Sequence, residues 1–251
     1  MGFVESEDLQ ATLHNGFYLN DLWGWTDPMT GNEYVIVGLK DGVSFVDITN
    51  PTSPELLGKL PETKTAASKV GSSQRILNGK STWRDIKVYQ NHAFIVSDLN
   101  ANHGMQVFDL TQLRGLSASS SRIFSADGFY GGVQSAHNIV INEATGFAYI
   151  VGISSGGGDC GEGGLHILDI SDPTNPVYTA CFDEDGYTHD AQCVIYEGPD
   201  TDYSGREICF NANENTFTVA DVHQKDSIYL VSRTGYDRNR YAHQGWLSED
   251  H

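Results

Sequence analysis

The stretch Gly164-Leu-His-Ile-Leu-Asp-Ile-Ser-Asp-Pro-Thr-Asn-Pro176 decides the fold, because its pattern returns along the chain. It is a short apolar run that ends in aspartate, and both here and at residues 42–54 a turn with two prolines follows it. Proline cannot donate a hydrogen bond within a sheet, so each of these turns ends a strand. Similar apolar runs ending in aspartate occupy residues 104–110 and 216–222. The chain is therefore built from repeated units of about 55 residues.

Each unit contains three further short segments that suit β-strands. The first segment begins with a polar motif, in the copies Asp21-Leu-Trp, Trp83-Arg-Asp, Ala136-His-Asn, Thr188-His-Asp and Ala242-His-Gln. An apolar run follows at 34–37, 93–96, 148–151 and 207–210, and a last segment closes each unit at 55–57, 122–124, 177–180 and 227–231. Four short antiparallel strands per unit are the signature of a β-propeller blade. We therefore expect an all-β fold, a β-propeller of four-stranded antiparallel blades.

The repeats also predict where the blades lie. Four complete blades are expected at about residues 18–60, 82–126, 134–183 and 187–234, and a fifth starts near residue 241. An unfinished blade would expose a sheet edge and an apolar flank. We therefore expect residues 1–251 to form a single β-propeller domain that is incomplete at its C-terminus and belongs to a larger propeller.

The chain is strongly acidic, with 15 Lys and Arg against 33 Asp and Glu and a formal net charge of −18. Phosphate backbones and anionic lipids repel such a chain, which argues against nucleic-acid partners and electrostatic membrane docking. No apolar run approaches the roughly 18 residues of a membrane span, and the first twenty residues do not have the pattern of a signal peptide. We expect a monomer without a membrane span in this chain, whose charge favours cationic ligands and metal ions.

The repeated strands ending in Val-Asp and the Asp-Pro-Thr-Asn-Pro turn resemble those of the LVIVD-repeat β-propellers, and more closely those of the choice-of-anchor B domain family. The matching segments are residues 20–25, 83–88, 135–139, 186–193 and 205–209. The resemblance implies a secreted or cell-surface protein without an established reaction. We therefore expect an extracellular binding or adhesion scaffold that recognises an extracellular ligand or surface partner.

The four cysteines, Cys160, Cys181, Cys193 and Cys209, favour two disulfides. If the first two strands of the fourth blade pair in antiparallel, Cys193 lies directly opposite Cys209. Cys160 and Cys181 fall on the same rim of the preceding blade, which permits a second bridge. Disulfides would indicate an oxidising compartment. The alternative is four reduced, buried thiols in a cytosolic protein.

Polar residues recur at the start of the first strand of successive blades, where a propeller places them around its central channel. We predict a ligand-binding surface at the channel mouth formed by Arg84, Asp85, His137, Asn138, His189, Asp190 and His243. The alternative is structural: each His-Asn or His-Asp pair would cap backbone groups and lock one blade onto the next. The four tryptophans near these strand starts are expected in the core between blades, with a sugar-binding platform as the alternative.

A divalent cation is the cofactor that these residues could hold. His137, His189 and His243 would suit zinc, whereas Asp159 and Glu162 in a glycine-rich loop would suit calcium, which prefers oxygen ligands. We identify no catalytic residue, because no motif singles out an activated nucleophile. If the protein is an enzyme, we expect a metal-dependent hydrolase or lyase at the channel mouth, with Asp85 or Asp190 as base.

Overall fold

The computed structural model describes residues 2–11, 19–63, 81–100, 103–161, 163–235 and 241–251. Within these residues it contains sixteen strands and two short 3-10 turns, Leu110–Leu113 and Gly158–Cys160. The strands form four separate antiparallel sheets of four strands, each in chain order. The predicted all-β class is therefore confirmed, and no helix among the described residues is long and apolar enough to cross a membrane.

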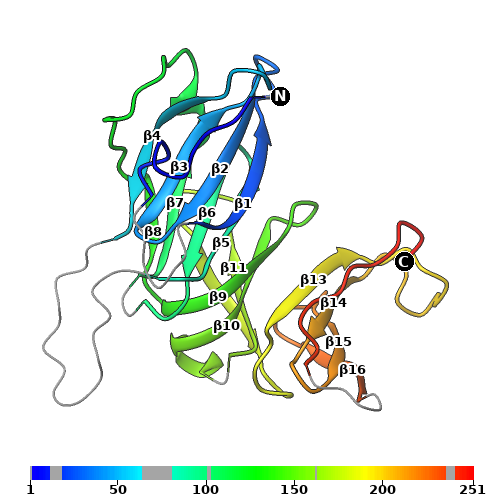
Figure 1. The fold of residues 1–251 in the computed structure, drawn as a ribbon. Helices are drawn as coiled ribbons and strands as arrows, with labels where there is room; N and C mark the ends of the chain where they lie inside the picture. The colour runs from blue at the N-terminus through cyan, green and yellow to red at the C-terminus, as the bar shows by residue number, and fades with distance from the viewer. Residues whose placement is uncertain (1, 12–18, 64–80, 101–102, 162, 236–240) are drawn as a thin grey trace, which may run out of the picture.

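Each sheet corresponds to one sequence repeat (Figure 1). The first sheet contains β1 (Leu19–Thr26), β2 (Glu33–Leu39), β3 (Gly42–Asp47) and β4 (Glu55–Pro61). The second contains β5 (Arg84–Tyr89), β6 (His92–Ser97), β7 (Met105–Asp109) and β8 (Gly128–Tyr130). The third contains β9 (Val133–Asn142), β10 (Phe147–Gly156), β11 (Leu165–Asp169) and β12 (Val177–Phe182). The fourth contains β13 (Asp190–Ile195), β14 (Glu207–Ala212), β15 (Phe217–Asp221) and β16 (Tyr229–Thr234).

The first strands of neighbouring sheets lie against one another: β1 contacts β5, β5 contacts β9, and β9 contacts β13. The sheets therefore converge at their first strands, as the blades of a propeller do at the channel. This arrangement brings residues more than 150 positions apart in sequence to one wall, from β1 to the segment after residue 241.

Apolar side chains fill the layers between successive sheets, because strand residues point alternately to opposite faces. In β6, Ala93 and Ile95 pack towards the first sheet, whereas Phe94 and Val96 pack towards the third. A third layer, which includes Tyr149, lies between the third and fourth sheets. The free face of the first sheet is covered by residues 2–11, which bury Leu9 against it.

The fourth strand of the second sheet differs from the prediction. We expected it at residues 122–124, but the sheet ends in β8, and residues 122–124 pair instead with β4 of the first sheet. The Lys59 amide donates to the Arg122 carbonyl at 2.9 Å, and the Phe124 amide donates to the Lys59 carbonyl at 2.8 Å. The Phe124 ring packs 5.4 Å from Phe45. Burial of this ring between two sheets decides the pairing, which a three-residue apolar run does not specify.

Both predicted disulfides are present, Cys160–Cys181 and Cys193–Cys209. Cys193 and Cys209 are direct partners in the antiparallel register of β13 and β14, as predicted. The Cys160–Cys181 bridge joins the turn at Gly158–Cys160 to β12. No cysteine of the chain is free.

Removing a disulfide should lower the free energy of unfolding. We expect the double substitution Cys193→Ala and Cys209→Ala to cost about 2–4 kcal/mol, because the unfolded chain loses a constraint. Urea denaturation of the oxidised variant measures this. As a control, treatment with a reductant should destabilise the native protein further than it destabilises the variant, since only the native protein has both bridges to lose. Equal stability of variant and native protein would contradict the prediction.

A buried glutamate joins the third and fourth sheets. The Glu207 carboxylate, 2% exposed, accepts hydrogen bonds from Asn142 at 2.7 Å, Thr145 at 2.8 Å and the Tyr149 hydroxyl at 2.6 Å. Its second oxygen lies 2.7 Å from Lys225 Nζ. Four donors on one carboxylate compensate the cost of burying its charge.

Glu207→Ala should destabilise the protein by about 3 kcal/mol or more, because it leaves the Lys225 charge and three donors without an acceptor. Chemical denaturation measures the change. The matched control is Glu184→Ala, at an exposed position, which should change stability by less than about 0.5 kcal/mol. Similar effects from the two substitutions would show that the buried network does not hold the sheets together.

Candidate functional site

An open cavity of about 850 Å³ lies where the first strands converge. Its wall is formed by β1, β5, β9 and β13 together with residues 243–246. We call it the groove. Its volume lies within the range of small-molecule sites in proteins. The groove therefore brings the first-strand residues of all four sheets to one surface.

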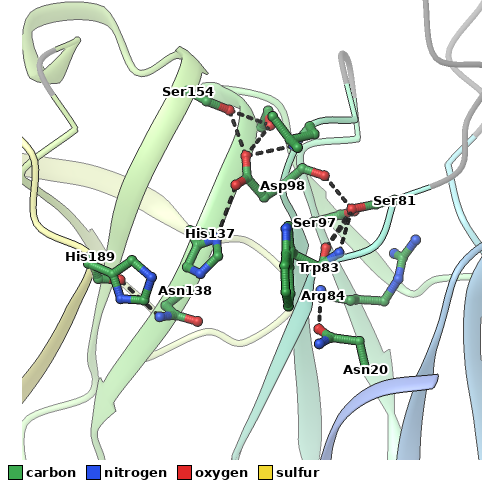
Figure 2. Close-up of polar contacts among 12 residues, drawn as sticks. Asn20, Ser81, Trp83, Arg84, Ser97, Asp98, His137, Asn138, Ser154 and His189 are labelled. Atoms are coloured by element: carbon green, nitrogen blue, oxygen red, sulfur yellow. Dashed lines mark hydrogen bonds and ion pairs between the residues drawn. The ribbon is translucent and has the colours of Figure 1, made fainter. Parts of the chain in front are cut away.

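One side of the groove is a row of neighbouring rings that are tilted against one another. The Trp83 ring lies 5.9 Å from that of His137, His137 lies 4.4 Å from His189, and His189 lies 4.3 Å from His243. Each ring comes from a successive repeat, so the structure brings the three predicted histidines together. Figure 2 shows Trp83, His137 and His189 in this order.

The imidazole of His137 is fixed by Asp98, which follows β6. His137 Nδ1 lies 3.0 Å from Asp98 Oδ2. The other carboxylate oxygen accepts hydrogen bonds from the hydroxyls of Ser154 at 2.8 Å and Ser135 at 3.2 Å (Figure 2). Burial alone would raise the pKa of Asp98, but the hydrogen bonds from His137 and Ser154 outweigh it and lower the pKa below its ordinary value. An ionised carboxylate only accepts, so the proton sits on His137 Nδ1.

His189 is held in a similar way by main chain. Its Nδ1 lies 2.8 Å from the carbonyl oxygen of His243, which can only accept, so this nitrogen carries hydrogen. Burial and, to a lesser extent, the neighbouring His137 lower the pKa of His189. The His189 ring is therefore neutral at pH 7, and its Nε2 has an available electron pair.

Asp85 and Asn138, which come one residue after Arg84 and His137 in the repeated motif, join neighbouring sheets. Asp85 Oδ2 accepts from the Ile139 amide at 2.7 Å, and Asn138 Nδ2 donates to the His189 carbonyl at 2.9 Å. Both contacts cap a backbone group of the next sheet, which is the structural role considered as the alternative to ligand binding. They use the side chains of Asp85 and Asn138 but not the Nε2 atoms of the histidines, so locking and ligand binding are compatible.

Arg84 does not lie with the histidines. Its guanidinium is fully buried between the first two sheets, with Nε 2.8 Å from the Leu39 carbonyl and Nη1 2.6 Å from His103 Nε2. A partial ion pair with Glu62 at 3.6 Å accompanies these bonds. Burial lowers the pKa of Arg84 to about 10, which leaves it charged at neutral pH. Because strand residues alternate in direction, Arg84 and Asp85 point to opposite faces of β5. Both residues border the groove, but the Arg84 guanidinium bonds Leu39 and His103 and is directed away from the histidines of the groove.

Carboxylates form the other side of the groove, with Asp21, Asp85 and Asp190 on its wall. Burial, together with a hydrogen bond to Asp85 and its charge, raises the pKa of Asp21 to about 7. Burial also raises the pKa of Asp190. Lys87 Nζ lies 2.6 Å from Asp85 Oδ1 and partly offsets this negative charge. Asp21 was missed by sequence reasoning, although it heads the first copy of the polar motif.

The tryptophans divide between core and groove. Trp25 is buried and stacks 5.2 Å from Tyr34, as expected for the core. Trp23 is partly buried and lies under Lys87 Nζ, 4.5 Å from the ring centroid. Trp23, Trp83 and Trp246 line the groove, and Trp83 and Trp246 are 42% and 81% exposed.

The predicted calcium residues lie elsewhere. Asp159 is in the turn at Gly158–Cys160, beside Cys181, and does not line the groove. Glu162 lies outside the described residues. Among the described residues, one group of three metal-type side chains is found with its ligand atoms close together: Cys160, Cys181 and Asp183. Its two sulfurs form a disulfide and cannot act as thiolate ligands.

The sheets and groove define a propeller-like repeat protein of the all-β class. Within it, residues 30–60 and 135–183 match the LVIVD repeat family, which supports the resemblance to that repeat. A solved structure of a functionally unknown protein from Desulfotomaculum acetoxidans DSM 771 is similar, with a TM-score of 0.53 and 14% identity over 90% of this chain. The match covers 59% of that protein and concerns the fold alone. No curated protein sequence matches the chain.

The raised pKa of Asp21 predicts a pH-dependent effect of Asp21→Asn. Between about pH 4 and 7 the folded protein binds more protons at Asp21 than the unfolded chain, so its contribution to stability falls as pH rises. Asparagine removes this penalty. At pH 8 the variant should be about 1 kcal/mol more stable than the native protein, a figure reduced for the partial exposure of the carboxyl; at pH 4 the gain should vanish.

Chemical denaturation at the two pH values tests this, with the exposed Asp226→Asn as control. The control removes the same formal charge without the contact to Asp85. A gain of the same size at pH 4 and pH 8 would contradict the assignment of the raised pKa to Asp21.

Proposed function

We propose that this protein is an extracellular binding scaffold of the choice-of-anchor B kind and that the groove holds its ligand. The exposure of Trp83 and Trp246 on the groove wall is the observation that carries the proposal. Large aromatic side chains exposed in a concave site are typical of ligand recognition, because their faces can stack on apolar or cationic groups. The two disulfides support an oxidising, extracellular environment.

The charge of the groove favours a cationic or neutral ligand. Four carboxylates line the groove, those of Asp21, Asp85, Glu143 and Asp190, with two cationic residues, Lys87 and Arg84. The net charge of the chain is −18. An anionic ligand would be repelled both at long range and at the wall. An amine or a polyhydroxylated compound fits the combination of carboxylates and tryptophan faces.

A metal-dependent hydrolase or lyase at the same groove is the second candidate, favoured by the Asp98–His137 pair. A carboxylate that orients an imidazole is a recurring arrangement in general acid–base catalysis. Asp85 is a poor base because both of its oxygens accept hydrogen bonds. Asp190, whose pKa burial raises, is the better proton carrier of the two.

Tryptophan fluorescence tests the scaffold proposal. We expect spermine, a cationic probe, or maltohexaose, a neutral one, to bind and change the emission, and a sulfated oligosaccharide to have no effect. Trp83→Ala and Trp246→Ala should each weaken binding by about tenfold, because each removes a stacking surface. The control Met29→Ala, at an exposed turn outside the groove, should leave binding unchanged. Preference for the anionic probe, no response to any probe, or unchanged binding in both tryptophan variants would contradict the proposal.

A further inference from the structure

We propose that His137 and His189 form a binding site for one divalent transition-metal ion, held by their Nε2 atoms. The proposal concerns the protein alone and does not depend on the groove ligand. It rests on the hydrogen bonds that the two rings make through Nδ1, on the groups that hold those bonds and on the contact between the rings.

The hydrogen bonds of the two rings decide which nitrogen can bind a metal. His137 donates from Nδ1 to Asp98, and His189 donates from Nδ1 to the His243 carbonyl. In a neutral imidazole one nitrogen carries hydrogen and the other has the electron pair. In the neutral form of each ring the electron pair is therefore on Nε2, and in the described part of the chain neither Nε2 has a hydrogen-bond partner.

The supports are those that metal-binding histidines commonly have. Such histidines donate their second nitrogen to a carboxylate or a backbone carbonyl, which fixes the ring and increases its basicity. Here His137 donates to a carboxylate and His189 donates to a backbone carbonyl. Asp98 is itself held by Ser135 and Ser154 and by the Leu99 amide at 2.6 Å, so His137 is oriented before any ion arrives.

The two rings are direct neighbours. Their centroids are 4.4 Å apart with an angle of 49° between planes, and Figure 2 shows them side by side next to Asn138. The His243 ring lies 4.3 Å from that of His189, at an angle of 47° between the planes. Since the three rings form a row and are not among the three-ligand groups of the described residues, we assign two protein nitrogens to the ion.

The donor type selects the class of ion. Imidazole nitrogens suit zinc, copper and nickel, whereas calcium and magnesium prefer oxygen ligands. The carboxylates of Asp21 and Asp190 interact electrostatically with that of Asp85, and Asp85 forms an ion pair with Lys87. The row of rings therefore offers nitrogen ligands to an ion, and these carboxylates are already used in contacts with each other and with Lys87.

Calorimetric titration of the chelator-treated protein with Zn²⁺ tests the site. We expect one ion per chain and no binding of Ca²⁺ in the same range. His137→Gln and His189→Gln should each weaken zinc binding by more than about tenfold, and Asp98→Asn by about tenfold through the lost support. The matched control is His92→Gln, because His92 also bonds a carbonyl through Nδ1, to Gln90 at 2.7 Å, and has no ring contact with another histidine.

A second measurement does not depend on variants that fold. In the native protein labelled with ¹⁵N-histidine, zinc should shift the Nε2 resonances of two histidines and leave their Nδ1 protons in place. Zinc binding that survives both His137→Gln and His189→Gln, or a metal shift at Nδ1, would overturn the proposal. Zinc binding without any response to spermine or maltohexaose would support this site while counting against the ligand proposal.

Discussion

The double-sided burial of the first three sheets is the constraint on which the rest of the structure depends. Because side chains alternate across a strand, β6 is apolar on both faces and has to be covered by a sheet on each side. Each sheet covers an apolar face of the next one in chain order. Residues 2–11 cover the face of the first sheet that has no preceding sheet against it. Convergence of the first strands, and so the groove, follows from this packing.

The groove combines two demands on the same few strand positions. Polar side chains such as Asp85 and Asn138 complete the hydrogen bonds of a neighbouring sheet, which buried backbone groups require. The histidines beside them line the groove and use Nδ1 for support, and in the described residues Nε2 has no hydrogen-bond partner. Because the same motif recurs in each unit, a repeat that places the capping side chains also places the histidines at matching positions of successive sheets.

Most of the fold could be predicted from the sequence, because repeated apolar runs and proline turns specify strands locally. The histidine row and both disulfides also follow from repeat register. Three features could not be predicted: the side to which Arg84 turns, the pairing of residues 122–124 with β4, and the contact of Asp21 with Asp85. Each depends on which sheet is the neighbour and on local irregularity, such as the register shift between Leu19 and Leu22 in β1. Asp98, which fixes His137, lies outside the repeated motif and carries no signal of its role.

The bond between His189 and the His243 carbonyl has a consequence for the order in which the protein forms during translation. The ribosome makes the chain from the N-terminus, and sheets that pack in chain order can assemble as they emerge. The last wall of the groove is different, because the ring of His189 gains its support from a residue synthesised much later. His189 therefore gains this support only after the last strand of the fourth sheet, β16, has been synthesised, so its ring is fixed later than the sheets that surround it.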